Sequence, residues 1–317
     1  MQQRYLGRTG LKVSRLGLGT LTWGRDTDEH EARDQLVAFT EAGGTLVDTA
    51  AGYGEGASEE LLGALIGDVV HRDDLVVATK AGISRARGHR ETNASRGYLI
   101  SQLDASLRRL RLDHVDLWQV HTWVEDTPLE ETLSALDYAV TTGRASYVGI
   151  SNYAGWQSAQ AATWQRAVPG RAALASNQVE YSLLNRKVEA EVLPAAEAMG
   201  LGVLPWSPLG RGVLTGKYRT GTPADSRAAS PHFANFVGAY LSDRHARVVE
   251  AVARAAEGLD WSPLEVALTW VRDRPGVTAP IIGARTAAQL RGSLTVEECE
   301  LPAQIVAALD DVSAEPV

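Results

Sequence analysis

Short apolar segments alternate with amphipathic segments about eight times along this chain, and this alternation constrains its fold more than any other feature. The apolar segments are short, and glycines commonly close the segments between them, as strands and helices in succession require. Strands that alternate with helices pair in parallel, since each helix carries the chain back across the sheet. The predicted strands span residues 15–20, 45–50, 74–80, 115–121, 146–151, 176–181, 202–208 and 278–284.

The intervening segments carry helix start and stop signals. The segment 29–42 follows Asp28, a suitable N-cap, and ends at Gly43 and Gly44. Many of the other helical segments end at a glycine in the same way. Further helices are predicted over residues 58–66, 95–110, 128–142, 156–167, 189–199, 244–256, 263–271 and 303–312.

About eight strand–helix units in 317 residues fit a closed (β/α)₈ TIM barrel better than an open doubly wound sheet. An open sheet that binds a dinucleotide would carry G-x-G-x-x-G after its first strand, and the sequence GLGTLTWG here lacks that spacing. The segment 4–14 predicts a small β-hairpin ahead of the first barrel strand, where it could plug the N-terminal mouth. Without linker-like tracts or repeats, residues 1–317 are expected to form one domain.

Composition excludes several classes of protein. Lys and Arg number 31 against 39 Asp and Glu, a net charge of −8 that argues against nucleic-acid binding. No apolar run approaches the roughly 18 residues of a membrane span, and the N-terminus lacks a signal peptide's apolar region. The single cysteine, Cys299, fits a reducing compartment. We therefore expect a cytoplasmic protein that binds neither membranes nor nucleic acid.

Polar side chains stand at the carboxyl ends of the predicted strands, where barrel enzymes place their active sites. A single polar residue there can simply begin a loop, but six successive strands share the feature, which favours a functional site. The residues are Asp48, Lys80, His121, Ser151, Asn152, Gln178, Trp206 and Ser207.

The residue types at these strand ends indicate proton transfer. Of seven histidines only His121 lies at a strand end, so we expect no metal site, and no G-x-S-x-G motif or P-loop occurs. Tyr53 follows Asp48 on a loop with glycines on either side. A lysine such as Lys80 can stabilise its phenolate, a carboxylate can orient that lysine, and a neutral imidazole can orient a carbonyl. Taken singly, Lys80 could be a surface lysine and His121 a core histidine.

Six segments resemble the signatures of the aldo-keto reductase superfamily, in the family's order and over roughly residues 4–310. They are GGTLVDTAAGYG, VVATK, DLWQVH, GISNY, PWSPLGRGVLTGKY and PIIGARTAAQL. The forms SPLGRGVLTGKY and IIGART are similar to the branch that contains bacterial reductases and potassium-channel β subunits. The resemblance implies a (β/α)₈ fold, a nicotinamide cofactor and reversible reduction of a carbonyl group.

The resemblance also assigns roles to individual residues. It implies that Tyr53 is the general acid and that Asp48, Lys80 and His121 complete a catalytic tetrad. Trp206 matches the aromatic residue that stacks on the nicotinamide, although it could also be barrel packing. The positions that bind the carboxamide are matched by Ser151, Asn152 and Gln178. Those that bind the pyrophosphate are matched by Ser207, Leu209, Gly210, Gly212 and Lys217, and those that bind the adenosine by Gly283, Arg285 and Gln289.

The choice of cofactor depends on the adenosine end. Arg285 matches a family position near the 2′-phosphate, and an arginine fork suits a phosphate dianion, which favours NADP(H) with NAD(H) as the alternative. Arg285 could instead be a solvated helix start. Gly292 and Ser293 depart from the family pattern, since relatives usually carry Glu and Asn there.

The substrate is expected to be a small molecule with an aldehyde, ketone or sugar-like carbonyl. Trp23, Trp123 and Phe233 are predicted to line its pocket. The loop 83–97 could recognise an anionic substrate or merely be solvated; its arginines are Arg85, Arg87, Arg90 and Arg96. The oligomeric state is not predicted.

Two rival functions remain open at this point. The same tetrad would suit a subunit that senses NADP(H) and regulates another protein with little turnover of its own. A barrel isomerase or metal hydrolase would need more histidines at the strand ends than this chain has.

Overall fold

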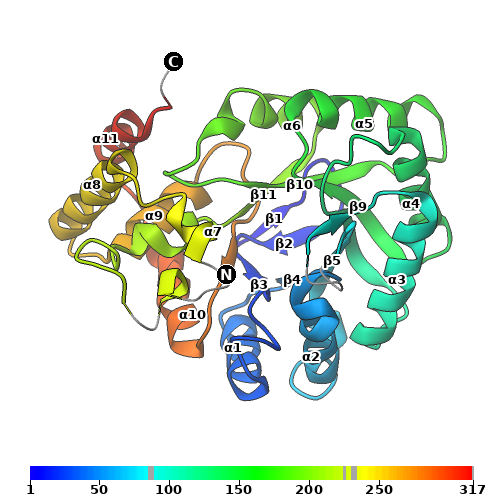
Figure 1. Cartoon of the computed structure of the whole chain (residues 1–317), viewed down its shortest axis with the longest axis horizontal. Helices are drawn as coiled ribbons and strands as arrows, with labels where there is room; N and C mark the ends of the chain where they lie inside the picture. Colours follow the sequence, from blue (N-terminus) through cyan, green and yellow to red (C-terminus); the bar gives the residue numbers. More distant parts are fainter. Residues whose placement is uncertain (85–88, 224–225, 230–233, 316–317) are drawn as a thin grey trace.

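A computed structural model describes residues 1–84, 89–223, 226–229 and 234–315. Parallel strands close into a barrel at its centre (Figure 1). They are β3 (Gly17–Gly19), β4 (Leu46–Asp48), β5 (Val76–Ala81), β8 (Val115–Val120), β9 (Ala145–Ser151), β10 (Leu174–Glu180), β11 (Gly202–Trp206) and β12 (Ile281–Gly283). Each pairs with its neighbour in the chain, and β12 pairs with β3. The predicted (β/α)₈ barrel is confirmed.

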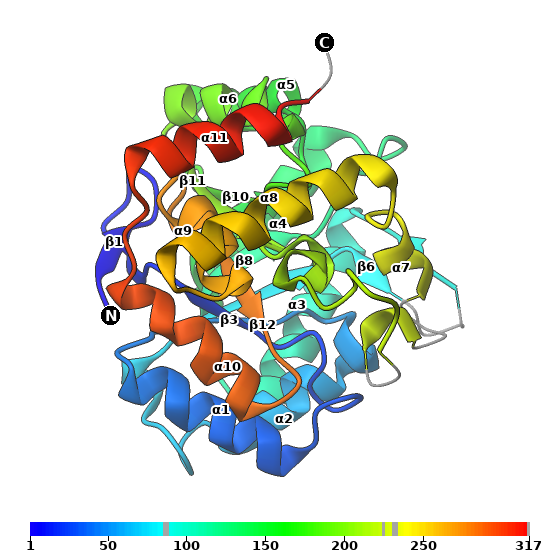
Figure 2. The same ribbon diagram turned by 90° about the vertical axis from the view of Figure 1, so that its left-hand side faces the viewer.

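Helices surround the barrel as its outer layer (Figure 1). The Asp28 carboxylate accepts a bond from the Glu31 amide and so caps the first helix as predicted. Figure 2 shows the C-terminal helix lying along the side of the molecule close to α8. The helices are α1 (Glu29–Glu41), α2 (Ala57–Leu65), α3 (Arg96–Leu110), α4 (Leu129–Thr141), α5 (Gly155–Ala167), α6 (Val192–Met199), α7 (Ala234–Gly238), α8 (Asp243–Leu259), α9 (Pro263–Arg272), α10 (Ala287–Leu294) and α11 (Ala303–Ser313).

The expected N-terminal hairpin is present and consists of β1 (Gln3–Tyr5) and β2 (Lys12–Ser14), which pair antiparallel. Next to these strands, Leu6 and Val13 are fully buried in one apolar cluster with residues from the barrel interior, among them Leu46 and Leu117. Leu46 opens β4, so the hairpin closes the N-terminal end of the barrel. The opposite end, where the strands finish, is left for the site.

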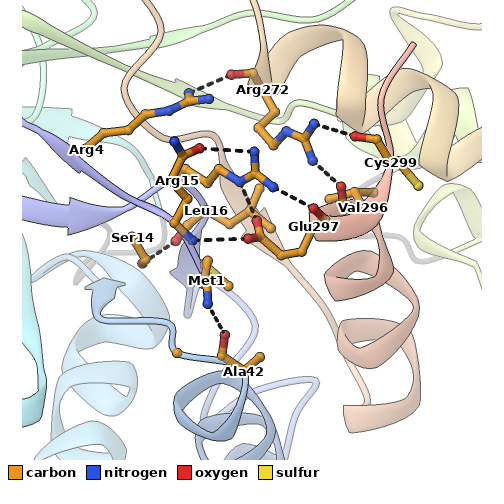
Figure 3. Close-up of polar contacts among 12 residues, drawn as sticks. Met1, Arg4, Ser14, Arg15, Leu16, Ala42, Arg272, Val296, Glu297 and Cys299 are labelled. Atoms are coloured by element: carbon orange, nitrogen blue, oxygen red, sulfur yellow. Dashed lines mark hydrogen bonds and ion pairs between the residues drawn. The ribbon is translucent and has the colours of Figure 1, made fainter.

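Polar contacts join the N-terminal segment to the chain that follows α10 (Figure 3). The Arg15 guanidinium donates to the Glu297 carboxylate at 2.8 Å and to the Glu297 carbonyl oxygen at 2.6 Å. Arg272, only 2% exposed, donates to the carbonyl oxygens of Val296 and Cys299. The first and last parts of the chain therefore hold each other against the closed end of the barrel.

The barrel interior changes from apolar to polar along its axis. Successive side chains of a strand point to opposite faces, so positions two apart share the interior. In β4 the buried Leu46 is followed by Asp48, and in β5 the buried Ala78 is followed by Lys80. The same step in β8 brings in Gln119, which pairs in register with Lys80. The ionic side chains thus lie at the C-terminal end of the barrel interior, and apolar side chains lie next to them toward its N-terminal end.

Candidate active site

A buried ion pair connects the ends of β4 and β5. The Lys80 ammonium lies 2.6 Å from one carboxylate oxygen of Asp48, and the two side chains are 0% and 2% exposed. The same ammonium lies 3.4 Å from the Tyr53 hydroxyl. Strand pairing produces this geometry, because β4 and β5 are neighbours and the Tyr53 loop follows β4 directly. Asp48, Lys80 and Tyr53 are therefore brought together as predicted.

The remaining hydrogen-bonding capacity of the ion pair is largely used. The Gln178 amide nitrogen donates to the second oxygen of Asp48 at 2.9 Å, and Lys80 also donates to the Thr49 carbonyl oxygen at 2.8 Å. A buried charge pair needs such partners, since desolvation would otherwise exceed the Coulombic gain. Gln178, expected to bind a carboxamide, thus also holds the carboxylate from β10.

The pKa values of Lys80 and Tyr53 are shifted in directions that favour a charged lysine and a protonated tyrosine. Burial alone would lower the pKa of Lys80, but the Asp48 carboxylate outweighs burial and raises that pKa above its usual value. Burial, together with the Asp48 charge, raises the pKa of the Tyr53 phenol above 10 even though Lys80 opposes the shift. Tyr53 consequently retains its proton through the neutral range and can donate it.

His121 lies at the end of β8 beside the tyrosine. Its ring centroid is 5.9 Å from that of Tyr53, with the rings edge to face. Burial, and then the positive charges of Lys80 and Arg90, hold the pKa of His121 well below 6.5, so the imidazole is neutral. Its Nδ1 is buried and has no hydrogen-bond partner in the described part of the chain. A neutral ring facing the same cavity as Tyr53 can hydrogen-bond a carbonyl oxygen.

The Tyr53 loop is held by a buried network that sequence reasoning missed. Glu59, fully buried at the start of α2, accepts hydrogen bonds from the Arg109 guanidinium at 2.7 Å and from the Thr79 hydroxyl. Thr79 is the residue before Lys80, so the network links the tyrosine loop to the lysine strand. Gly56 adopts φ +102°, and a Cβ there would lie 2.8 Å from the Arg109 side chain. A carboxylate in the helix segment GASEE was the available signal.

A cavity of about 510 Å³ opens at this end of the barrel, a size typical of small-molecule sites. Of the sixteen residues predicted to be catalytic or to bind the cofactor, fourteen line it, and Lys80 and Gly210 do not. Those that line it are Asp48, Tyr53, His121, Ser151, Asn152, Gln178, Trp206, Ser207, Leu209, Gly212, Lys217, Gly283, Arg285 and Gln289.

Trp206 and Asn152 are joined in the cavity wall. The Trp206 indole nitrogen donates to the Asn152 side-chain oxygen at 3.0 Å, and the Asn152 amide nitrogen donates to the His121 carbonyl oxygen at 2.9 Å. Asn152 adopts a left-handed φ of +59°, which is tolerated by asparagine. This asparagine therefore ties the tryptophan at the end of β11 to the histidine at the end of β8.

The loop after β11 turns sharply along the cavity. Ser207, Gly210, Arg211 and Gly212 all have positive φ values between 52° and 91°. Turns of this kind can direct backbone N–H groups toward an anion. A Cβ at Gly212 would lie 3.3 Å from the Lys217 ammonium, so glycine leaves room for that cation beside the cavity.

Another part of the cavity wall is formed by the β12–α10 turn. Arg285 and Gln289 line it, and the Arg285 amide donates to the Gln289 side-chain oxygen at 3.0 Å. Ser293 also lines the cavity, but Gly292 does not, and a Cβ added at Gly292 would meet open space. The helix α10, absent from the predicted set, provides this wall.

Two residues expected in the substrate pocket, Trp23 and Trp123, are not among those that line this cavity. Trp23 is fully buried and donates to the Gln35 side-chain oxygen, because its loop folds inward between α1 and the barrel. Trp123 instead packs edge-on against Tyr153 and Trp156.

The third residue expected in the substrate pocket, Phe233, falls outside the described residues. Apolar residues that sequence reasoning did not select, among them Leu21, Ile83 and Leu264, also line the cavity. Leu21 belongs to the same loop as Trp23, two positions earlier.

Within the described ranges, no group of three or more His, Cys, Asp or Glu side chains is arranged to hold a metal ion. No helix there is long and apolar enough to cross a bilayer.

The fold and the strand-end site define a (β/α)₈ barrel of the oxidoreductase type. The model of the aldo/keto reductase family matches residues 15–314, and the chain belongs to that family. Aldo/keto reductases generally use NAD(H) or NADP(H), so an oxidoreductase with a nicotinamide cofactor is the class to which this chain belongs.

The curated relatives cover nearly the whole chain. The chain is 38% identical to "Uncharacterized oxidoreductase YrpG" of Bacillus subtilis (strain 168), over 100% of this chain and 97% of the relative. It is 38% identical to "Probable voltage-gated potassium channel subunit beta" of Oryza sativa subsp. japonica, over 90% and 87%. It is 35% identical to "L-glyceraldehyde 3-phosphate reductase" of Escherichia coli (strain K12), over 92% and 86%.

Proposed function

We propose that this protein is an NADPH-dependent reductase that converts an aldehyde, ketone or sugar-like carbonyl to an alcohol, with Tyr53 as the general acid. The observation that carries the proposal is the Tyr53 hydroxyl 3.4 Å from a buried Lys80 that is itself paired with Asp48. The hydroxyl and the neutral His121 face one cavity. A relative named as a reductase of an aldehyde phosphate supports this substrate class.

The residues that line the cavity suit the chemistry of the cofactor. Trp206 would stack on the nicotinamide, and the carboxamide would meet Ser151, Asn152 and Gln178. The turn with positive φ values and Lys217 would hold the pyrophosphate. When bound, the reduced nicotinamide supplies the hydride that reduces the carbonyl carbon.

The protein's own residues would handle the proton. Tyr53 donates its phenolic proton to the carbonyl oxygen, and the resulting phenolate is stabilised by the Lys80 ammonium. Asp48 keeps that ammonium charged and oriented, while His121 hydrogen-bonds the carbonyl oxygen and fixes its direction. Because the pKa of Tyr53 is above 10, reduction should persist through neutral pH and be lost only when the phenol ionises in alkaline solution.

Arg285 would give the preference for NADP(H). It lines the cavity on the turn between β12 and α10, where the adenosine would lie. Its guanidinium can donate two parallel hydrogen bonds to a phosphate. Replacement by Gln should weaken NADPH binding about tenfold or more while leaving NADH binding nearly unchanged. Equal losses for the two cofactors would contradict this role.

The decisive test of the proposal removes the phenolic hydroxyl. Wild-type protein should consume NADPH with 4-nitrobenzaldehyde, and Tyr53→Phe should lower turnover about 10²- to 10⁴-fold. Quenching of tryptophan fluorescence by NADPH should be unchanged. Tyr153→Phe is the matched control, because Tyr153 is buried nearby but does not line the cavity. Retained turnover in Tyr53→Phe would reject Tyr53 as the acid.

The rival function is a subunit that binds NADP(H) and regulates another protein. The relative named as a potassium-channel β subunit favours it. A panel of aldehydes and ketones separates the two, because a sensor should oxidise its bound NADPH once and slowly on every substrate. Repeated turnover on any carbonyl compound of the panel would favour the reductase.

A further inference from the structure

Charged side chains of both signs line the catalytic cavity. Its only carboxylate in the described lining is Asp48, which Lys80 already neutralises. Arg211 is likewise neutralised, because its Nε and one terminal nitrogen each donate a hydrogen bond to the Glu180 carboxylate at 2.8 Å. The other charged residues in the lining are the cations Arg90, Lys217 and Arg285. Cationic side chains therefore outnumber carboxylates among the described residues that line the cavity.

These cations lie at different places along the cavity. Lys217 and Arg285 belong to the β11 loop and the β12–α10 turn, where the cofactor's phosphates would lie. Arg90 instead comes directly before β7 (Glu91–Thr92), which forms a small two-stranded sheet with β6 (Ile83–Ser84). Arg90 is exposed, and it makes no hydrogen bond or ion pair within the ranges the structure describes.

The backbone beside Arg90 is fixed to the catalytic end of the cavity. Ile83, in the same two-stranded sheet, also lines the cavity. Its carbonyl oxygen would lie only 2.7 Å from a Cβ placed at Gly52, so it packs against the residue before Tyr53. At the base of the sheet, the Asn93 amide donates to the Gly82 carbonyl oxygen at 3.0 Å. The two-stranded sheet therefore directly follows β5 in the chain and packs against the loop that carries Tyr53.

The charge of Arg90 reaches the site of proton transfer. After burial and Lys80, Arg90 is the third cause that lowers the pKa of His121. No carboxylate is among the causes acting on that ring. The nearest acidic neighbour in the chain, Glu91, is paired with His89 at 2.9 Å.

We infer that Arg90 is a specificity-determining residue that binds an anionic group, a carboxylate or a phosphate, carried by the carbonyl substrate. An arginine fork matches either group and binds it through charge-assisted hydrogen bonds. The inference rests on the proposed function, in which the carbonyl lies at Tyr53 and His121. The substrate's anionic end then faces the one cation of the lining that belongs to the catalytic end of the described cavity.

The test compares substrates that differ in charge. Wild-type protein and Arg90→Gln are assayed with 4-carboxybenzaldehyde against methyl 4-formylbenzoate, and with glyceraldehyde 3-phosphate against glyceraldehyde. The variant should lose about 10- to 100-fold in kcat/KM on the anionic member of at least one pair, mainly through KM. The neutral members should change less than about twofold. The pair that responds identifies the anion as a carboxylate or a phosphate.

Arg96→Gln is the matched control, because Arg96 begins α3 shortly after this sheet but does not line the cavity. Arg96→Gln should leave kcat/KM unchanged for all four substrates. Equal losses on the charged and neutral members in Arg90→Gln, or no loss on either, would overturn the inference while carbonyl reduction by the wild type would still support the proposed function.

A binding measurement separates the inference from turnover. Calorimetry measures the dissociation constants of unreactive 4-methylbenzoate and glycerol 3-phosphate, with 4-methylbenzyl alcohol and glycerol as neutral counterparts. At least one of the anions should bind about tenfold or more weakly to Arg90→Gln than to wild type. If the wild type reduces none of the substrates, the proposed function fails and this comparison alone decides whether Arg90 binds anions. Unchanged binding of both anions would then reject the role.

Discussion

The two ends of the barrel interior use opposite means of filling space. At the N-terminal end, Leu6 and Val13 of the hairpin region pack on apolar barrel residues. At the C-terminal end, Asp48 and Lys80 are buried as an ion pair. Apolar packing stabilises a fold, whereas a buried ion pair adds little net stability over apolar residues of similar volume. The apolar end therefore contributes to the stability of the fold, and the charged end contributes little to it.

A substitution of Lys80 tests this difference between the charged and the apolar end of the barrel most directly. Lys80→Met leaves the Asp48 carboxylate buried without its cation, so we expect the free energy of unfolding to fall by about 3–5 kcal/mol. Turnover should fall at least about 100-fold, because the Tyr53 phenolate loses its stabilising charge. Urea denaturation and steady-state NADPH oxidation measure the two effects.

A double variant distinguishes charge from shape in this experiment. Adding Asp48→Asn to Lys80→Met removes the uncompensated carboxylate and should recover more than half of the lost stability. Turnover should stay low in the double variant. Recovery of neither quantity would mean that packing, rather than the unpaired charge, explains the loss in the single variant.

The opposite end should respond in the opposite way. Leu6→Ala opens a cavity in the hairpin plug, and we expect a loss of about 2–5 kcal/mol in the free energy of unfolding. The turnover of the folded protein should remain within about twofold of wild type, since Leu6 lies at the far end of the barrel from Tyr53. Leu6→Met is the volume-conserving control. A large fall in kcat at temperatures where Leu6→Ala is folded would contradict the separation of roles.

A pH titration tests the charged end through His121. The folded protein holds the pKa of His121 well below 6.5, so the unfolded chain binds more protons between those two pKa values. Stability should therefore fall as the pH drops below about 6.5, with a contribution from this residue of at most about 1.4 kcal/mol per pH unit. His121→Gln should make the loss shallower. His114→Gln, at an exposed position, should retain the wild-type slope.

Local patterns were enough to predict the barrel and the placement of polar side chains at the carboxyl ends of its strands. Each barrel strand overlaps the segment predicted for it, because short apolar runs between helix caps leave few alternatives. Asp48, Lys80 and His121 could be found because every parallel strand delivers its last residues to the same end. The rule concerns position along a strand and needs no knowledge of distant contacts.

Features set by distant contacts were not predictable in this way. Nothing in the loop that contains Leu21 and Trp23 shows that the leucine faces the cavity while the tryptophan is buried against Gln35. The support that Glu59 receives from Arg109 joins residues 50 positions apart. Such contacts depend on how α2 and α3 pack together, which the periodicity of either helix alone does not specify.

The smallest expected effects separate the cavity wall from the aromatic residues around it. Leu21→Ala removes a side chain that lines the cavity and should raise KM for 4-nitrobenzaldehyde about three- to tenfold, the scale expected for a small apolar contact. Trp123→Phe should change KM by less than about twofold, because the ring meets Tyr153 and Trp156 instead of the cavity. Steady-state kinetics at saturating NADPH measure both. The reverse order would place the substrate against Trp123 and return that tryptophan to the pocket wall.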